Sequence, residues 1–333
     1  MSHIDLRIET QQNPVADDVS ALIAVVRPIL TGLLFSLKDD VAKEVGGHEN
    51  VKLKLLPRLR LQGDGDVGIC YEYAVHDAVR RNDPLISERI ADALKKYCKV
   101  PGNNVESILF GAEKSGVVQL IDTAKNVLTD DSRILTGRQA QPPKLKAYLN
   151  MLAAAFSRES TRLALPSSIN GLWKADLFIG CTDSDRWVGT SVKINPKHLE
   201  GANGLRVGIV PSVQGKSDKI SFDRQKNLVV CPLPYDASFM EVFYSSWGIV
   251  QQFLKADAKV PKEVSLPNPA HRQVTKELAS RREFPVLDVV EALGPLAQPH
   301  LLVNSTSSVS VEQSRIATSS ITETMIAPIS RAK

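Results

Sequence analysis

Apolar and polar residues alternate in two neighbouring segments of the chain, residues 172–180 and 186–195. A period of two residues is typical of β-strands, whose side chains point alternately to the two faces of a sheet. The polar stretch at 181–186 predicts a turn, so the two segments are expected to form a β-hairpin. Its apolar face is predicted to hold Trp173, Ala175, Leu177, Ile179, Val188, Thr190, Val192 and Ile194.

The opposite face of this hairpin is predicted to be polar. A turn centred on residues 183–184 opposes Asp176 to Ser191 and places Lys193 on the neighbouring diagonal, within roughly 7–8 Å. A slip of one residue would drive Asp176 into the apolar face, so the hydrophobic pattern itself specifies the register. We therefore expect Asp176, Ser191 and Lys193 to lie together on one face of the sheet.

The remaining chain mixes helical and extended patterns. Helices are predicted at 19–45 (with a break near Pro28), 68–81, 85–98, 117–128, 144–160 and 237–255. Strands are predicted at 105–110, 205–210, 219–223 and 227–233, and residues 51–62 read as an edge strand or extended arm. These elements indicate an α/β protein with a mixed central β-sheet flanked by helices.

Three regions follow from this pattern. Residues 1–62 are expected to form an N-terminal helical region, and residues 63–257 an α/β core with a helical insertion at about 100–160. Beyond residue 257 the chain is polar and interrupted by prolines. From residue 303 it is so rich in serine and threonine that we expect residues 258–333 to be a partly flexible extension.

Composition is ordinary for a globular protein of 333 residues, with 43% hydrophobic and 23% charged residues. The net charge of +4 permits a nucleic-acid partner without demanding one. Arg27 and Pro28 interrupt the apolar segment 19–36, which favours a buried helix over a membrane span. The N-terminal stretch has no leader pattern, and the four cysteines are widely spaced. We expect a cytoplasmic protein that is not in a membrane.

An aspartate beside a lysine on a sheet suits the hydrolysis of phosphodiester bonds. The carboxylate of Asp176 can hold Mg²⁺, which polarises a phosphate and lowers the pKa of a bound water. The ammonium of Lys193 can orient that water or stabilise negative charge on the phosphorus centre. The competing interpretation is a surface ion pair on a solvated hairpin, which is common in proteins.

A helix that starts at a glycine turn and carries a glutamate in its first turns precedes this hairpin. It contains Gly68 and, among apolar neighbours, Glu72. With Asp176 in a strand, a turn, and a second strand ending in Ser191-Val192-Lys193, the chain resembles the PD-(D/E)xK, or restriction-endonuclease-like, superfamily. The resemblance implies a metal-dependent nuclease in which Glu72 and Asp176 bind Mg²⁺ or Mn²⁺. It also implies that Lys193 is the catalytic lysine, with the Val192 carbonyl as a further ligand.

The same resemblance implies a nucleic-acid partner, DNA or alternatively RNA, and by analogy a role in restriction or antiviral defence. Ser191 stands where the family has its second acidic residue, so either water or another carboxylate completes the metal shell or the site is weakened. Glu159, just before the hairpin, is the rival to Glu72, and His76 lies one helical turn after Glu72.

Two further hypotheses stay open at this point. The chain is either a catalytically inactive subunit that binds nucleic acid or a protein partner, which Ser191 favours, or a structural or assembly protein whose hairpin only packs. A homo-oligomer is compatible with all three hypotheses.

Overall fold

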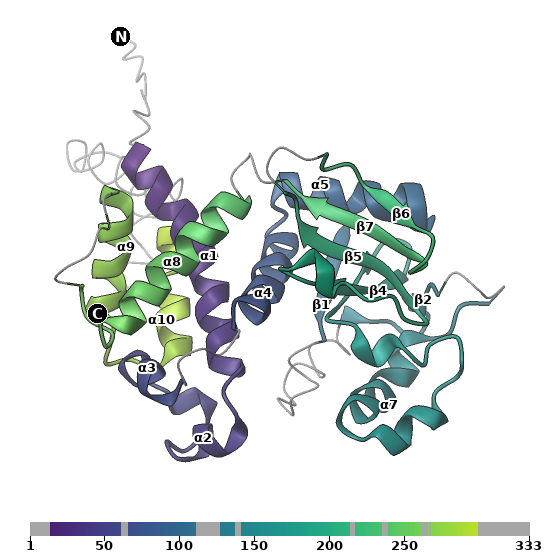
Figure 1. Cartoon of the computed structure of the whole chain (residues 1–333), viewed down its shortest axis with the longest axis horizontal. Helices are drawn as coiled ribbons and strands as arrows, with labels where there is room; N and C mark the ends of the chain where they lie inside the picture. Colours follow the sequence, from purple (N-terminus) through teal and green to yellow (C-terminus); the bar gives the residue numbers. More distant parts are fainter. Residues whose placement is uncertain are drawn as a thin grey trace, which may run out of the picture.

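A computed structural model describes residues 14–60, 66–110, 127–136, 141–213, 217–234, 239–261, 266 and 268–298 of the chain. In Figure 1 a group of helices lies on one side, a β-sheet with its own helices lies on the other, and helix α4 (Val67–Arg80) lies between them. The protein is a mixed α/β protein, as the sequence predicts. The expected helix at 117–128 falls almost wholly outside the described residues, and so does the tail from 303.

The central sheet of the described chain has seven strands and mixed topology. Six follow the order β1-β3-β4-β5-β7-β6, and β2 pairs with β4 beside this path. Neighbours β1, β3 and β4 are antiparallel, β4, β5 and β7 are parallel, and β6 is antiparallel to β7. The bounds are β1 Val105–Leu109, β2 Arg133–Ile134, β3 Leu177–Cys181, β4 Arg186–Val192, β5 Leu205–Pro211, β6 Ser221–Asp223 and β7 Leu228–Leu233.

The hairpin of β3 and β4 has the predicted register. Leu177 pairs with Thr190, which sets Asp176 opposite Ser191. The first strand is shorter than expected, because Leu172–Lys174 form a 3₁₀ turn and β3 begins only after Asp176. Strand β4 ends at Val192, so Lys193 follows it directly.

Both faces of this hairpin are buried, which excludes the competing interpretation of a solvated hairpin, and the face predicted to be polar is largely apolar. On one face Leu177 and Val188 belong to the core shared with α4 and α5 (Pro84–Ala93). On the other face Phe178 and Trp187 are fully buried in a second core with α7 (Leu145–Ser157). A sheet covered by helices on both faces carries apolar residues at consecutive positions, and Phe178 and Trp187 both break the simple alternation.

The described parts of the region 100–160 (residues 100–110, 127–136 and 141–160) pack into the core. They supply β1, which hydrogen-bonds along β3, and α7, which covers the second face of the sheet. The region expected as an insertion therefore contributes to both cores. Residues 84–98 form α5 followed by a π-helical turn, Leu94–Cys98, close to the predicted helix.

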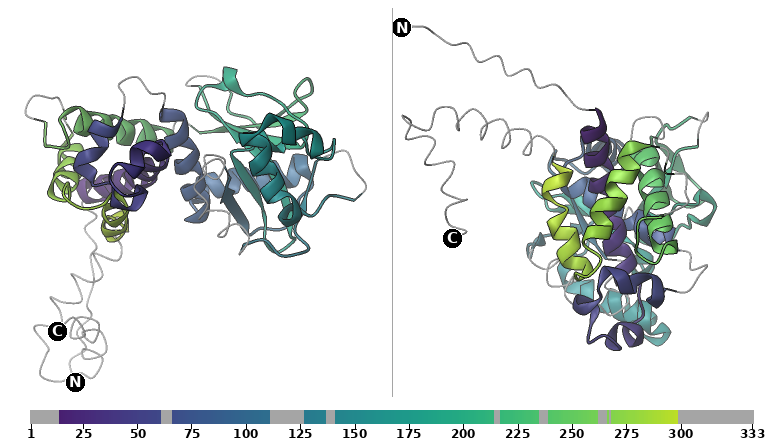
Figure 2. Two further views of the ribbon diagram at one scale, coloured as in Figure 1. Left: turned by 90° about the horizontal axis from the view of Figure 1, so that it is seen from below. Right: turned by 90° about the vertical axis from the view of Figure 1, so that its left-hand side faces the viewer.

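The helical part of the molecule combines both ends of the described chain (Figure 2). Helix α1 (Pro14–Phe35) packs against α4, α8 (Phe239–Lys255), α9 (Pro269–Ser280) and α10 (Val286–Ala292), with the short helix α2 at Asp39–Lys43. The chain after residue 257, expected as a polar extension, thus forms packed helices as far as residue 292. Its buried side chains include Val274, Leu278 and Val289.

Two local expectations in this part are wrong. Helix α1 runs through Pro28 without a break, because helices on several sides hold it and because Ser246 and Arg27 side chains bond carbonyls across these contacts. Residues 53–59 are helical turns, 3₁₀ Leu53–Leu55 and α3 Leu56–Leu59, rather than a strand. The backbone of residues 51–54 pairs with that of residues 282–286, which do not form a strand either.

Helix α1 contains a stretch, Asp17–Phe35, whose mean hydropathy of 1.8 and length would suffice to cross a membrane. In the structure 67% of this stretch is buried inside the protein. A core helix passes the same test of length and composition, and the four helices packed around α1 account for its apolar character.

Candidate active site

Asp176 lies where the three antiparallel strands meet. Its carbonyl accepts a hydrogen bond from the N–H of Phe110, next to the end of β1, at 2.9 Å. Its own N–H donates to the carbonyl of Thr190 on β4, also at 2.9 Å. The backbone of Asp176 is therefore fixed from both neighbouring strands, and its side chain starts from a defined position.

One carboxylate oxygen of Asp176 accepts three hydrogen bonds. The N–H of Val192 donates to Oδ2 at 2.8 Å, the Lys193 ammonium at 2.7 Å and the Ser191 hydroxyl at 3.2 Å. The residue is only 6% exposed. Burial of a charged carboxylate is costly unless it is paired and hydrogen-bonded, and the end of β4 supplies both kinds of partner.

Lys193 joins Asp176 to Glu72. Its Nζ is 3.5 Å from Oε1 of Glu72, and its backbone N–H donates to the carbonyl of Ile209 on β5 at 3.0 Å. Burial of the ammonium lowers the pKa of Lys193, but the carboxylates of Asp176 and Glu72 together outweigh this and raise the pKa above its ordinary value. Lys193 is therefore a cation at neutral pH, and its side chain is still 31% exposed.

Glu72 reaches this place from the second turn of α4. Its neighbours Tyr71 and Tyr73 are buried, so the helix is held against the protein on both sides of the glutamate. The Glu72 side chain is 14% exposed and faces Lys193. Glu159, the rival carboxylate, is 87% exposed and pairs with Arg162 at 3.1 Å. The structure brings Glu72, and not Glu159, into the cluster.

Ser191 hydrogen-bonds to Asp176 in this arrangement. The serine is buried, and its hydroxyl donates to the carboxylate. The cluster of Glu72, Asp176, Ser191 and Lys193 therefore combines two carboxylates, one ammonium and one hydroxyl. The three hairpin members follow from the register, which the sequence predicts.

The His76 side chain contacts β1. Its Nδ1 is 3.0 Å from the Ser107 hydroxyl on β1. Burial, with a smaller contribution from the charge of Arg80, lowers the pKa of His76 to about 3, so the ring is neutral at physiological pH. The histidine therefore connects α4 to β1 one turn away from Glu72.

The donor set at the cluster can be compared with what Mg²⁺ requires. Among the described residues no group of three or more His, Cys, Asp or Glu side chains is arranged to hold a metal ion. Mg²⁺ is usually bound through one or two carboxylates, with waters and substrate phosphates as the other ligands. Glu72 and Asp176, which share the Lys193 ammonium, fit that smaller requirement.

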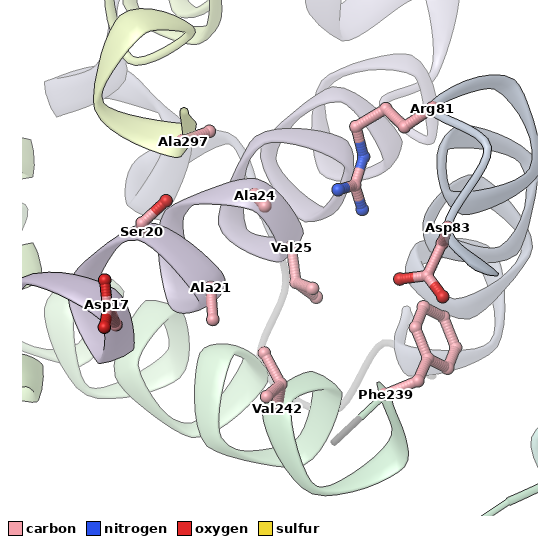
Figure 3. Close-up of a pocket in the computed structure, with 10 residues that line it drawn as sticks. All are labelled: Asp17, Ser20, Ala21, Ala24, Val25, Arg81, Asp83, Phe239, Val242 and Ala297. Carbon is pink, nitrogen blue, oxygen red and sulfur yellow. The ribbon is translucent and has the colours of Figure 1, made fainter. Parts of the chain in front are cut away.

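Two cavities lie beside the cluster's helix. Neither could be predicted from the sequence, because their walls come from distant segments. The first, of about 300 Å³, is shown in Figure 3 between α1, α8 and the turn after α4. The Arg81 guanidinium points into it, and the carboxylates of Asp17 and Asp83 also line it. Asp83 accepts a hydrogen bond from Ile86 N–H at the start of α5. One of the two carboxylates that line this cavity therefore also caps a helix.

No family model, no curated protein and no solved structure matches this chain. The class that fold and site define is thus a mixed α/β protein with a carboxylate–lysine–carboxylate cluster at the end of an antiparallel hairpin.

Proposed function

We propose that this protein is a metal-dependent nuclease that hydrolyses phosphodiester bonds. The observation that carries the proposal is the position of Lys193 between Asp176, on the same hairpin, and Glu72, which precedes Lys193 by 121 residues. A lysine held charged between two carboxylates, at a partly exposed place where strands end, is a candidate functional site. The PD-(D/E)xK resemblance, stated from the sequence, assigns roles to the same three residues.

In this proposal Glu72 and Asp176 hold Mg²⁺ or Mn²⁺. When bound, the metal polarises the phosphate and lowers the pKa of a water molecule. Lys193 is protonated, so it donates to a phosphate oxygen and stabilises the negative charge that develops there. Ser191 and the Val192 N–H keep the Asp176 carboxylate in a fixed orientation. The substrate is DNA, with RNA as the alternative, and restriction or antiviral defence is the corresponding biological role.

The test is a cleavage assay with plasmid and with DNA and RNA oligonucleotides, in Mg²⁺ or Mn²⁺ and in EDTA. Wild type is compared with Asp176→Asn and Lys193→Ala. Lys174→Ala is the matched control, because Lys174 precedes the same hairpin but pairs with Glu200 on the surface. We expect cleavage that needs metal, falls at least a hundredfold in both site variants, and is unchanged in the control. Cleavage that survives in EDTA or in both site variants would refute the proposal.

A second candidate function is a catalytically inactive subunit that binds nucleic acid or a protein partner. The observation that favours it is Ser191, which donates a hydrogen bond to Asp176 where a nuclease of this pattern has an acid. This function predicts no cleavage in that assay. Binding of the same oligonucleotides, measured by gel shift, should be present and unchanged by substitution of Asp176 or Lys193. Neither binding nor cleavage would leave a structural or assembly role.

A further inference from the structure

The Lys193 ammonium contacts both carboxylates that are proposed to hold a metal ion. Its Nζ lies 2.7 Å from Oδ2 of Asp176 and 3.5 Å from Oε1 of Glu72. One cation of the chain itself therefore faces the two anions that a divalent ion would use. A metal ion that bridges the same two carboxylates competes with Lys193 for them.

The oxygen of Asp176 that Lys193 contacts is already saturated. An ionised carboxylate offers about four lone-pair sites on its two oxygens, so each oxygen accommodates about two donors. Oδ2 accepts three hydrogen bonds, from the Val192 N–H, the Ser191 hydroxyl and the Lys193 ammonium. A metal ion can coordinate this oxygen only if one of these donors leaves.

Lys193 is the donor that can leave most easily. The Val192 N–H belongs to the end of β4, whose pairing with Ile209 of β5 fixes it, and Ser191 is buried. The Lys193 side chain is 31% exposed, and its ammonium sits on a flexible four-carbon stem. Its charge can move to another partner while its backbone N–H stays bonded to Ile209.

The charges of the cluster indicate what that other partner is. Two carboxylates and one ammonium leave a net charge of −1, which a divalent ion would change to +1. Two cations then repel each other at a partly buried place. A phosphodiester carries one negative charge, so metal, ammonium and phosphodiester together bring the site to neutrality. The ammonium can then pair with the phosphate in place of the carboxylates.

We propose that Lys193 is an internal counter-ion, which keeps a divalent metal weakly bound until a phosphodiester binds and draws the ammonium away from Asp176 and Glu72. The inference rests on the proposed function and deepens it, because it makes the binding of metal and substrate cooperative. By linkage, the phosphodiester raises the affinity for metal by the same factor as the metal raises the affinity for the phosphodiester. Metal is then loaded mainly together with the substrate.

The test measures Mn²⁺ binding and does not depend on cleavage. The electron paramagnetic resonance signal of free Mn²⁺ gives its Kd for wild type, Lys193→Met and Lys174→Met. Lys174→Met is the matched control, because it removes the same charge from a surface pair with Glu200. Glu72→Gln shows whether the measured Mn²⁺ binds at the cluster. Circular dichroism reports on folding, and Lys193→Gln replaces Lys193→Met if the latter does not fold.

The same titrations are repeated with dimethyl phosphate, a phosphodiester anion without a nucleoside. A titration without protein corrects for the complex that this anion itself forms with Mn²⁺. Because the anion offers the ammonium an alternative partner, it should tighten Mn²⁺ binding several-fold more in wild type than in the Lys193 variant.

Without the anion, the Kd for Mn²⁺ should fall about tenfold in the Lys193 variant, stay unchanged in Lys174→Met and rise in Glu72→Gln. A folded Lys193 variant that binds Mn²⁺ no more tightly than Lys174→Met does would overturn the counter-ion role and leave the nuclease standing. So would an equal response of variant and wild type to dimethyl phosphate. Absence of Mn²⁺ binding from every protein, with and without the anion, would refute the metal site and the proposed function with it.

Discussion

At the scale of single residues, the structure concentrates charge around one carboxylate oxygen. Asp176 Oδ2 receives the Lys193 ammonium, a backbone N–H and a hydroxyl, and Lys193 has Glu72 as its second partner. Removing one member of such a group is more costly than the pair is worth, because the remaining charges lose their compensation in a partly buried place. Lys193 is the member that contacts both carboxylates.

Lys193→Met should therefore lower the free energy of unfolding by about 1–3 kcal/mol, a range reduced for its partial exposure. Urea denaturation at pH 7 measures the change. Lys174→Met is the control, since it removes an exposed lysine paired with exposed Glu200 and should change stability by less than about 0.5 kcal/mol. Equal effects of the two substitutions would mean that the cluster is no more than a surface ion pair.

His76 makes stability depend on pH in a predictable direction. Its pKa is lowered to about 3 in the folded protein, chiefly by burial, against about 6.5 in an unfolded chain. Between these values only the unfolded state binds the proton, so the free energy of unfolding falls as the pH drops from about 6.5, by at most about 1.4 kcal/mol per unit.

The variant His76→Gln should reduce this slope in urea denaturation between pH 7 and pH 4. Part of the slope should remain, because burial also lowers the pKa of His271. A slope that is the same in variant and wild type would show that His76 is protonated in the folded protein.

The hairpin members of the cluster could be predicted from the sequence because they lie within 18 residues and the alternation fixes their register. Glu72 could be singled out by its apolar flanks, although only the structure decides between it and Glu159. The second cavity, which Arg27, Tyr73 and Arg80 help to line, could not be predicted, since it forms only when α1 and α10 pack beside α4. No local pattern of apolar and polar residues predicts that α1 and α10 pack beside α4.

At the scale of elements, the hairpin is the rigid support of the site. Gly180 on β3 packs closely on β4: a Cβ added there would lie 2.9 Å from Cα of Trp187 and closer still to the carbonyl of Arg186. Neither backbone atom can move without disturbing the strand pair that sets Asp176 opposite Ser191. Periodicity identified both strands, but it could not show that helices cover both faces.

Gly180→Ala should lower the free energy of unfolding by about 1–3 kcal/mol, through overpacking between the strands. Gly248→Ala in α8 is the matched control, since nothing lies within 4 Å of the added Cβ. There alanine should raise stability by about 0.5–1 kcal/mol, because glycine disfavours a helix interior. Both changes are measured by chemical denaturation, and a Gly180→Ala protein as stable as wild type would contradict this packing.

At the scale of the whole molecule, the two ends of the described chain pack together, because α9 and α10 cover α1. Residues of α9 and α10 that looked polar in sequence hide one apolar face each, and Val274, Leu278 and Val289 are fully buried. Short amphipathic helices separated by prolines resemble a loose extension until their partner is known. Helix α4 contacts both α1 and β1, so the site lies between the two parts of the molecule.

A chain ending at residue 257 should lose stability by several kcal/mol, because it exposes the face of α1 that α9 and α10 cover. That is a large part of the total stability of a domain. Circular dichroism melting and size-exclusion chromatography of the truncated chain should show an unfolded or aggregated protein. A soluble truncated chain that melts within a few degrees of the full-length protein would show that these helices are dispensable.

The most direct test of the proposed nuclease compares Glu72→Gln with Glu159→Gln in single-turnover cleavage of a labelled oligonucleotide in Mg²⁺. The two substitutions make the same chemical change, one at the carboxylate that faces Lys193 and one at an exposed surface pair. The cleavage rate should fall at least a hundredfold in Glu72→Gln and stay at the wild-type value in Glu159→Gln. A wild-type rate in Glu72→Gln, or a loss confined to Glu159→Gln, would contradict the site described for this protein.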